Sequence, residues 1–442
     1  MKKITLYNFR CFENFEWDFT PGINLIVGDN SSGKTSLLRA CRLVAGSFFA
    51  GFSDENTVWP GPESADFRDV IVDGVKLPVK AIEIQFLLDA EMYPDIDMAF
   101  KRGDDEIAFN PSMANPYSLR KNSPKNTKQL SSGISAYKAY CKALQENENQ
   151  NLPLPLFAFF STEDIHASRK IDAGKFKEEY LKRSFGYYFC LDSNGLLPYW
   201  EKRLLVMKEL QQDCVEVKVV TDALLNALGE SGCGILRDVS VRPMRGKVYY
   251  TLADGRVVDS TILSDGYKRL VNIVMDLAFR AYILNRPTFG ADVCEYSRGT
   301  VLVDEVDLHL HPSLQVRALP SIAAAFPGIQ FIATTHAPLV MSSVGNNERD
   351  TVSKIEFDGR DSYSRVAIDA FGFDASSIMT SILGVYDRDI NVQHDLDSLF
   401  GLIDDERIEE ARAMFDAMKE KYGNLPDLAR AGVTIDFFSP EL

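Results

Sequence analysis

Residues 28–35 read GDNSSGKT, which matches the Walker A pattern of a glycine, four residues and then glycine, lysine and threonine. An apolar strand is predicted before it, at 22–27, and a helix with apolar residues at helical spacing after it, at 37–49. Glycines in such a loop let backbone N–H groups turn inward around phosphates at a helix N-terminus. A chance glycine-rich turn would match the letters, but it would not need this order of strand, loop and helix.

The Walker A segment supplies most of the predicted nucleotide contacts. Lys34 is expected to hold the β and γ oxygens of ATP, and the Thr35 hydroxyl is expected to bind Mg²⁺. The other predicted contacts are groups of the same loop: Asn30, Ser31, Ser32, Gly33 and Ser36. ATP and Mg²⁺ are therefore the predicted cofactors, and this segment alone indicates a P-loop nucleotide hydrolase of any branch.

A second segment, VLVDEVDLHLHP at 301–312, has the form of a Walker B motif. Its apolar start predicts a buried strand that delivers Asp304 and Glu305 at its C-terminal edge. Asp304 is expected to act through Mg²⁺, which prefers hard oxygen ligands. Glu305 is expected to orient and partly deprotonate the attacking water as a general base. Two carboxylates at an ordinary strand end are the alternative, which the Walker A match disfavours.

Histidines gather in the same region of the chain. His336 follows the apolar run FIATT, so we expect it at the end of the next strand, where its imidazole can donate to the γ-phosphate or to the water. Alternatively, His309 and His311 could form a metal cluster with the acids. That alternative requires ligands to converge from a strand end and the loop that follows it.

The segment LSDGYKR at 263–269 precedes a long apolar helix, so Ser264 and the next N–H groups are predicted at a helix N-terminus. A plain helix cap would explain Ser264. The L-S-x-G core with Gly266 and its position upstream of the acidic strand instead match an ABC signature. In that interpretation the signature of one protomer faces the γ-phosphate in the other, so catalysis requires a dimer.

The rest of the chain predicts a mixed α/β protein. Of its 442 residues 45% are hydrophobic, enough for more than one core. Alternating residues predict short strands at four places: 2–9, 14–19, 81–88 and 246–258. We expect 81–88 at a sheet edge and 246–258 as a hairpin that turns at Asp254-Gly255. A helix is predicted near the C-terminus, with Gly423 as its C-cap.

We expect an ATPase head in two lobes, with an insertion between them and a tail after them. The predicted pieces are an N-terminal lobe with Walker A at 1–89, a largely helical insertion at 90–235, a C-terminal lobe with the signature, Walker B and histidine switch at 236–350, and a C-terminal strand with a helical tail for partner or dimer contacts at 351–442.

Charge and cysteine content narrow the functional classes. The formal net charge is −15, which disfavours tight non-specific coating of nucleic acid. Seven cysteines without a C-x-x-C pair indicate reduced thiols in a cytoplasm. We expect neither a signal peptide nor a membrane span, because no apolar run is long enough.

These segments, together with NFRCF at 8–12 and TTHAPLVMSS at 334–343, resemble the SMC-related AAA-family ATPases of bacterial anti-phage defence. That group includes the PtuA-type subunits of Septu and some retrons and the ATPase domain of overcoming-lysogenisation-defect proteins. The resemblance implies an ABC/SMC-type P-loop ATPase head. It further implies that Arg10 approaches the nucleotide phosphates and that LHLHP at 308–312 lies near a dimer seam.

The resemblance implies a function as well. By this resemblance the chain is expected to be an ATPase with slow turnover, which forms a homodimer or a higher even oligomer around nucleotide. The ATPase would control a separate effector, a nuclease or another toxin. Nucleic acid would then be reached through the complex, and the insertion and acidic tail would be docking surfaces. We do not expect a nuclease in this chain, because Asp387-Arg388-Asp389 follows a predicted helix rather than a strand. No glutamine is assignable to a Q-loop, since Gln85 lies mid-strand.

Two other classes remain open at this stage. A repair ATPase of the RecF type would clamp duplex DNA; the basic stretches 120–142 and 169–183 favour it, whereas the net charge disfavours it. A transporter ATPase would need a docking surface for membrane helices and a shorter span between Walker A and signature.

Overall fold

The computed structural model describes residues 1–51, 61–72, 74–89, 93, 99–102, 105–108, 117–122, 135–146, 151–162, 182–192, 196–210, 214–360, 362–386 and 388–438. The chain divides into two units, which are treated separately below. The head unit is Met1–Phe373 and the C-terminal unit is Asp374–Leu442.

A six-stranded sheet forms the centre of the head unit. Its strands lie in the order β10 (Leu156–Phe160), β14 (Gly299–Val303), β15 (Ile329–Thr334), β3 (Ile23–Val27), β16 (Thr351–Phe357) and β17 (Tyr363–Ile368). The first five are parallel and β17 is antiparallel at the edge. Every residue of β3, β14 and β15 is buried, as expected for parallel strands covered on both faces.

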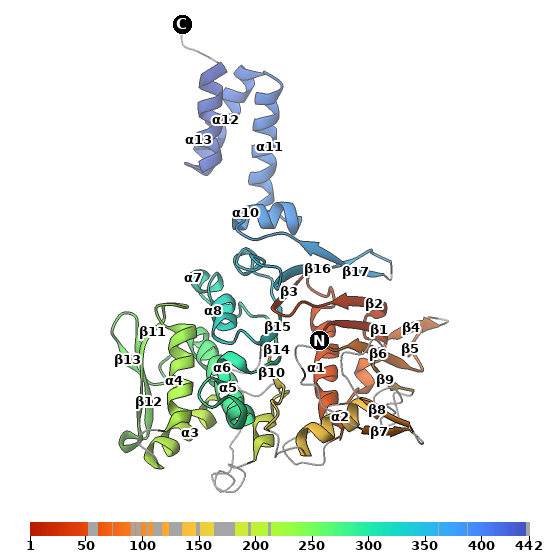
Figure 1. The fold of residues 1–442 in the computed structure, drawn as a ribbon. Coiled ribbons are helices and arrows are strands. Elements are labelled where there is room, and N and C mark those ends of the chain that lie inside the picture. The colour runs from red at the N-terminus through yellow and green to blue at the C-terminus, as the bar shows by residue number, and fades with distance from the viewer. Residues whose placement is uncertain are drawn as a thin grey trace. The chain divides into compact units, whose positions relative to one another are not determined.

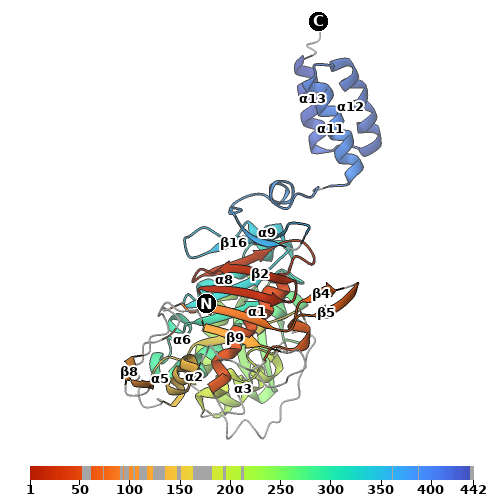
Figure 2. The ribbon, with the colours of Figure 1, turned by 90° about the vertical axis from the view of Figure 1, so that its right-hand side faces the viewer.

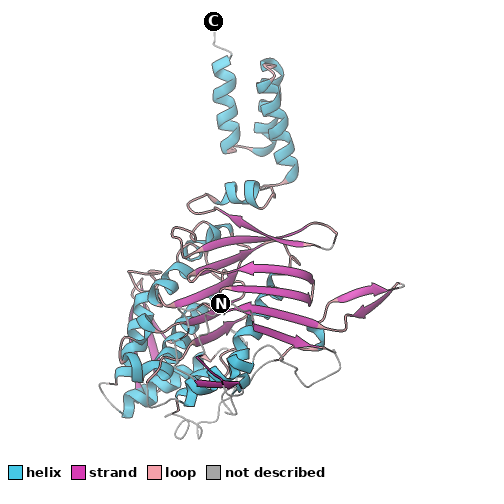
Figure 3. Ribbon diagram, turned by 45° about the vertical axis from the view of Figure 1, so that its right-hand side comes forward, coloured by secondary structure: helices cyan, strands magenta, loops and turns pink. Residues whose placement is uncertain are grey.

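A second, antiparallel sheet has the order β2 (Phe12–Asp18), β1 (Lys3–Phe9), β6 (Ile82–Leu87) and β9 (Tyr117–Lys121). The prediction that 81–88 is an edge strand is wrong, because β9 pairs with β6 on its outer side. Two hairpins are added, β4 (Asp69–Val72) with β5 (Val75–Pro78) and β7 (Ala99–Arg102) with β8 (Asp105–Ala108). Figure 3 shows the β4–β5 hairpin projecting from the sheets.

Helix α1 (Lys34–Gly46) lies between the two sheets. It contacts β14 and β15 on one side and β1 and β6 on the other (Figure 1), and its apolar side chains are buried. A short 3₁₀ turn, Ser47–Gly51, continues it and contacts α2 (Ser135–Glu146). The predicted strand, loop and helix are thus confirmed, and the helix anchors both sheets.

Helices cover the other side of the parallel sheet. They are α3 (Leu197–Leu210), α4 (Val215–Leu228), α5 (Asp265–Phe289), α6 (Val293–Tyr296) and α8 (Ala318–Ala325), with the short α7 (Pro312–Gln315) and α9 (Pro338–Met341) nearby in the chain. In Figure 1, α4, α5 and α6 lie on one side of the central strands and α1 on the other. None of the described helices is long and apolar enough to cross a membrane.

A three-stranded sheet of β11 (Leu236–Arg242), β12 (Lys247–Leu252) and β13 (Val257–Val258) packs on α3 and α4. The predicted hairpin is confirmed: the Leu252 N–H donates to the Arg256 carbonyl at 2.8 Å, and Gly255 has φ 88°. A left-handed residue at this turn suits glycine, which has no Cβ to clash.

The domain division drawn from the sequence stays a prediction, although the sheet crosses its boundaries. β10 comes from 90–235 and β16 and β17 come from 351–442, yet all three belong to the central sheet. Much of the predicted insertion at 90–235 lies outside the described residues.

The C-terminal unit is a three-helix bundle of α11 (Ile390–Asp404), α12 (Ile408–Tyr422) and α13 (Pro426–Phe438), preceded by α10 (Ala375–Ser377) and a π-helical turn, Ile378–Ile382. Figure 2 shows the three helices side by side. Gly423 ends α12 as predicted. Asp389 caps α11 by accepting from the Asn391 N–H at 2.9 Å, so this member of the D-x-D letters serves as a helix cap.

A buried polar network joins the helices of the head unit. The Asp276 carboxylate accepts from Trp200 Nε1 at 2.6 Å and from Arg280 Nε at 2.6 Å. Arg280 also donates to the carbonyls of Gly186 and Tyr188, at 2.8 and 3.0 Å. Because Arg280 is buried, its positive charge would be uncompensated without the Asp276 carboxylate.

We predict that Asp276→Ala destabilises the head unit by about 3–5 kcal/mol, since it leaves a buried guanidinium without its counter-ion. Urea unfolding followed by tryptophan fluorescence measures the loss. The control is Glu16→Ala, whose carboxylate pairs with Lys3 on the surface. It should leave the unfolding midpoint unchanged. Equal midpoints for the two variants would contradict the prediction.

Candidate active site

Three parallel strands bring the sequence motifs to one edge of the head sheet. Ile26 of β3 pairs with Thr334 of β15, and Ala333 of β15 pairs with Val303 of β14. The loop after β3, the carboxylates after β14 and the histidine segment after β15 therefore leave the sheet side by side. This carboxyl edge is where open α/β sheets bind ligands.

The P-loop backbone is fixed by tight packing at Gly33. This residue is the N-cap of α1 and has φ 99°. A Cβ there would lie 2.7 Å from Cζ of Phe12 and 3.0 Å from Sγ of Cys11, so only glycine fits. No side chain caps α1 and no acidic residue lies in its first turn. The helix end thus keeps the partial positive charge that attracts anions.

Lys34 is folded over this loop and only 7% exposed. Its ammonium donates to the carbonyls of Gly28 and Asp29, both at 2.8 Å. Burial lowers the pKa of Lys34, while the carboxylates of Asp29, Asp304 and Glu305 act to raise it. The ammonium therefore lies within the electrostatic field of the acids that follow β14.

The hydrogen-bond donors of the loop suit the phosphates of a nucleoside triphosphate. Among the described residues, the Ser32 hydroxyl is buried and has no hydrogen-bond partner, an uncommon state for a polar group. It lies in the P-loop beside the α1 N-terminus and Lys34, so the loop offers a hydroxyl, backbone N–H groups and an ammonium to an anion. Thr35 and Asp304 offer the oxygen ligands that Mg²⁺ prefers.

The Asp304 carboxylate and the Glu305 backbone, which follow β14, are held by β15. The Thr334 hydroxyl donates to Asp304 Oδ1 at 2.6 Å and accepts from the Glu305 N–H at 2.8 Å. Glu305 itself has φ 47°, a left-handed conformation that is uncommon outside glycine. Such local strain occurs where the surrounding structure fixes a functional group.

Arg269 links the signature helix α5 to the backbone of the same two residues. Its guanidinium donates to the carbonyl of Asp304 at 2.6 Å and to the carbonyl of Glu305 at 2.8 Å. The side chain is only 2% exposed. The backbone of the acidic strand end is therefore braced from β15 on one side and from α5 on the other.

A further contact joins the signature to the loop after the acids. A Cβ on Gly266 would lie 2.4 Å from the carbonyl oxygen of His309, so α5 approaches this loop more closely than any other residue type allows. Asp307 in the loop accepts from the Thr335 hydroxyl at 2.5 Å. The signature, the acidic strand end and the histidine segment thus form one connected piece.

Ser264 caps α5, as the sequence predicts. Its hydroxyl accepts from the Tyr267 N–H at 3.4 Å, a long hydrogen bond. Ser264 and Asp265 are exposed, whereas Gly266 is buried against the His309 loop. The cap and the exposed surface are both present, so the helix start can serve as a cap and face a second molecule.

The metal-cluster alternative for His309 and His311 finds no support. Within the described ranges, no group of three or more His, Cys, Asp or Glu could hold a metal ion. His311 is instead the N-cap of α7, where its Nδ1 accepts from the Ser313 N–H at 3.3 Å.

Arg10 is expected at the nucleotide phosphates, and in the structure its guanidinium pairs with the carboxylate of Asp66. Its Nε donates to Asp66 Oδ1 at 2.9 Å, and Arg39 donates to Asp66 Oδ2 at 3.1 Å. Burial acts to raise the pKa of Asp66, but Arg39 and Arg10 outweigh it and leave the pKa below its usual value. The role of Arg10 at the phosphates stays a prediction, as does that of His336, which is exposed after β15.

Sequence reasoning missed three residues that position the site: Arg269, Thr334 and Thr335. All three lie within quoted motifs, at the end of LSDGYKR and at the start of TTHAP. A signal existed in the paired threonines, because hydroxyls at the end of a buried strand need partners.

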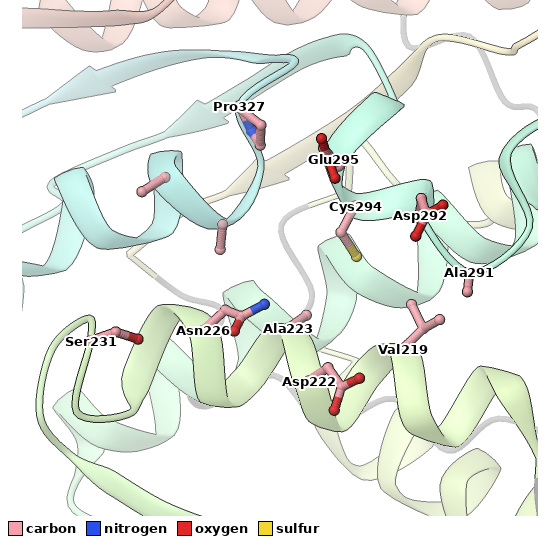
Figure 4. Close-up of a pocket in the computed structure, with 12 residues that line it drawn as sticks. Val219, Asp222, Ala223, Asn226, Ser231, Ala291, Asp292, Cys294, Glu295 and Pro327 are labelled. Atoms are coloured by element: carbon pink, nitrogen blue, oxygen red, sulfur yellow. The ribbon is translucent and has the colours of Figure 1, made fainter.

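One pocket of about 630 Å³ lies between α4, α6 and α8 (Figure 4). Asp222, Asp292 and Glu295 contribute carboxylates to it, and none of the predicted nucleotide residues lines it. Burial raises the pKa of its Cys294 to about 12, so this thiol stays protonated. The pocket is separate from the P-loop edge.

Two side chains of the first basic stretch that favoured a DNA clamp bind groups of this chain: Arg120 pairs with Glu83, and Lys121 donates to the Pro62 carbonyl. Residues 123–134 of the first and 169–181 of the second lie outside the described residues.

Family models match nearly the whole head. A model described as an AAA domain matches residues 3–226. A second AAA-domain model, whose description adds a type IV toxin–antitoxin system, matches residues 208–342. Together the two cover the P-loop, the signature and the acidic strand end.

Curated relatives come from two kinds of system. The retron Vc95 probable ATPase of Vibrio cholerae is 23% identical over 408 residues, covering 81% of this chain and 74% of that protein. The Septu protein PtuA of Bacillus mycoides is 25% identical over 412 residues, covering 90% of this chain but only 46% of its own length. A solved SMC head bound to the C-winged-helix domain of ScpA is 17% identical with a TM-score of 0.46, covering 83% of this chain and 98% of that one.

We predict that Lys34→Ala weakens ATP binding about 100-fold or more, because two charge-assisted hydrogen bonds to phosphate are each worth about 1.5–3 kcal/mol. Titration with a fluorescent ATP analogue measures the affinity. Lys76→Ala, on the projecting hairpin, should bind as the parent does. Unchanged affinity in Lys34→Ala would remove this residue from the site.

Gly266→Ala is expected to lower ATP turnover about 10- to 100-fold, since the added methyl forces α5 away from the His309 carbonyl and misplaces the site. Steady-state phosphate release measures it. The matched control is Gly401→Ala in α11, where a Cβ meets nothing within 4 Å. Full activity of Gly266→Ala would show that this contact does not govern catalysis.

Proposed function

The chain belongs to the AAA-domain family, and from that premise we propose that it is an SMC/ABC-like ATPase, the ATP-binding and hydrolysing subunit of a bacterial anti-phage defence system. One observation carries the proposal. The P-loop, the two carboxylates and the histidine segment leave three neighbouring strands at one sheet edge. The similarity to a retron ATPase and to Septu PtuA supports the defence context.

Binding rests on the P-loop. Lys34 exchanges its backbone carbonyl partners for β and γ oxygens, and the Ser32 hydroxyl gains an acceptor there. Backbone N–H groups at the α1 start complete the cradle. The loop residues Asn30, Ser31, Gly33 and Ser36 line it. Arg10 reaches toward the phosphates from the β1–β2 turn.

Hydrolysis rests on the acidic strand end. Glu305 orients the attacking water and takes up its proton, and His336 donates a hydrogen bond toward the γ-phosphate or the water. Thr35 and Asp304 would hold Mg²⁺, which would neutralise charge on the phosphate oxygens. Turnover is slow in this proposal, because the nucleotide acts as a switch.

The site is completed by a second copy of the chain. Ser264 and Gly266 of one protomer face the γ-phosphate held by the other, so a two-fold pair closes two sites. The exposed position of Ser264 supports this arrangement. Higher even oligomers build on the same pair.

The dimer controls a separate effector protein in the cytoplasm, and nucleic acid is reached through that effector. All seven cysteines are free thiols, which suits a reducing compartment. The relatives named Septu PtuA and retron ATPase support a role as one subunit of a larger system.

Glu305→Gln should lower ATP turnover about 10²- to 10⁴-fold while leaving ATP binding intact, because it removes the general base but keeps the shape of the side chain. Phosphate release and native mass spectrometry with ATP and Mg²⁺ test this together. The expected result is an ATP-bound dimer of the variant. Glu348→Gln, on an exposed turn, is the control. Turnover unaffected by Glu305→Gln would remove the base role.

A DNA clamp of the RecF type makes a different prediction. Its affinity for duplex DNA would be measurable with the Glu305→Gln dimer and would fall steeply and linearly in log units as salt rises. We expect no such binding by the isolated chain. A dimer that gains mass only when duplex DNA is added would replace the effector proposal with the clamp.

A further inference from the structure

Helix α13 is apolar on two opposite faces. One face packs into the bundle core through Leu428, Ala431 and Ile435, which are at most 2% exposed. The opposite face carries a stripe at i, i+4 and i+8: Ala429, Val433 and Phe437. Val433 is 71% exposed and Phe437 is 79% exposed. A helix that is apolar on both faces normally lies buried between two partners.

Helix α12 differs from α13. The outer face of α12 is dominated by charged residues, including Glu409, Glu410, Asp416, Lys419 and Glu420, all exposed. The hydrophobic core is already complete without the stripe, since its members come from the three inner faces. The stripe on α13 is therefore surplus to folding and is suited to insertion into a groove of another molecule.

Charge identifies the kind of molecule. The C-terminal unit has 15 Asp and Glu against 6 Lys and Arg, a formal charge of −9 out of −15 for the chain. The head therefore carries −6, so this chain's own head and a second bundle are both net acidic and lack charge complementarity to the bundle. A separate protein with a net basic surface around an apolar groove is attracted to it instead.

We propose that the α13 stripe is the docking site for a separate, basic protein, which inserts Val433 and Phe437 into an apolar groove and surrounds them with Lys and Arg. This inference rests on the proposed function, in which the ATPase controls an effector. Phe437, the last residue of the stripe, is the kind of aromatic anchor on which binding energy concentrates.

The test uses the full-length tagged chain, purified from its host with ATP and Mg²⁺, and native mass spectrometry of what accompanies it. The stripe variant is Val433→Asp with Phe437→Asp. The matched control is Ala413→Asp with Ala417→Asp, which adds the same two charges at the same spacing on exposed positions of α12. Circular dichroism and ATP turnover should be unchanged in both. If the stripe variant unfolds, Val433→Ala with Phe437→Ala replaces it.

The expected result is a second protein in fixed ratio with the parent and the control, reduced at least about 10-fold with the stripe variant, because two carboxylates are placed in an apolar groove. Its sequence should have a net positive charge, and its retention should fall as salt rises. Equal retention by the stripe variant, or an acidic partner, would overturn the docking site alone. If the stripe variant instead reduces the chain's own oligomer, the stripe is a contact between copies and the proposal is wrong. No second protein with the parent chain would refute the effector role itself, and the docking site with it.

Discussion

The parallel pairing of β3, β15 and β14 is the constraint on which the rest of the head depends. Backbone hydrogen bonds set this register, and all residues of the three strands are buried, so a slip by one position would exchange the side chains of the two covered faces and disrupt the packing on both. With the register fixed, the three strands must end together. The P-loop, the acids and the histidine segment, which follow these strands, are therefore brought together at one edge of the sheet.

A protein with a net negative charge repels a polyanion on average, so its binding site must attract the anion locally. The loop does this with groups that carry little or no net charge, the N-terminus of α1 and a hydroxyl, and with one buried ammonium. Burial weakens the charged form of Lys34, and the surrounding carboxylates strengthen it. A bound triphosphate adds further negative charge beside the ammonium. Its presence therefore acts to raise the pKa of Lys34 and favours the protonated form.

Sequence periodicity predicted the helix and the strands that position the motifs, because a long apolar helix and buried strands have strong local patterns of apolar residues in the sequence. It missed β10, in which two prolines precede LFAFF, although proline is tolerated at the start of an edge strand. It also placed β6 at an edge, because its partner β9 is a short strand with a lysine and an arginine. Pairing between segments far apart in the chain has no local signature.

The side chains that brace the site were harder to foresee than those expected to react. Walker residues are recognisable by spacing, whereas the roles of Arg269 and Thr334 depend on which carbonyl and which carboxylate the fold places beside them. Such bracing residues exist to satisfy buried polar groups, and only the folded arrangement shows which groups need satisfying.

The close approach of Gly266 to the His309 carbonyl has a consequence for association. Because the signature and the loop after the acids are already locked together within one chain, a molecule that meets this face meets a surface whose backbone is ordered in advance. Little conformational freedom is then lost at the moment of contact. The entropy of ordering this face has been lost during folding, so in the dimer that we propose the free energy released on association is available to discriminate between nucleotide states.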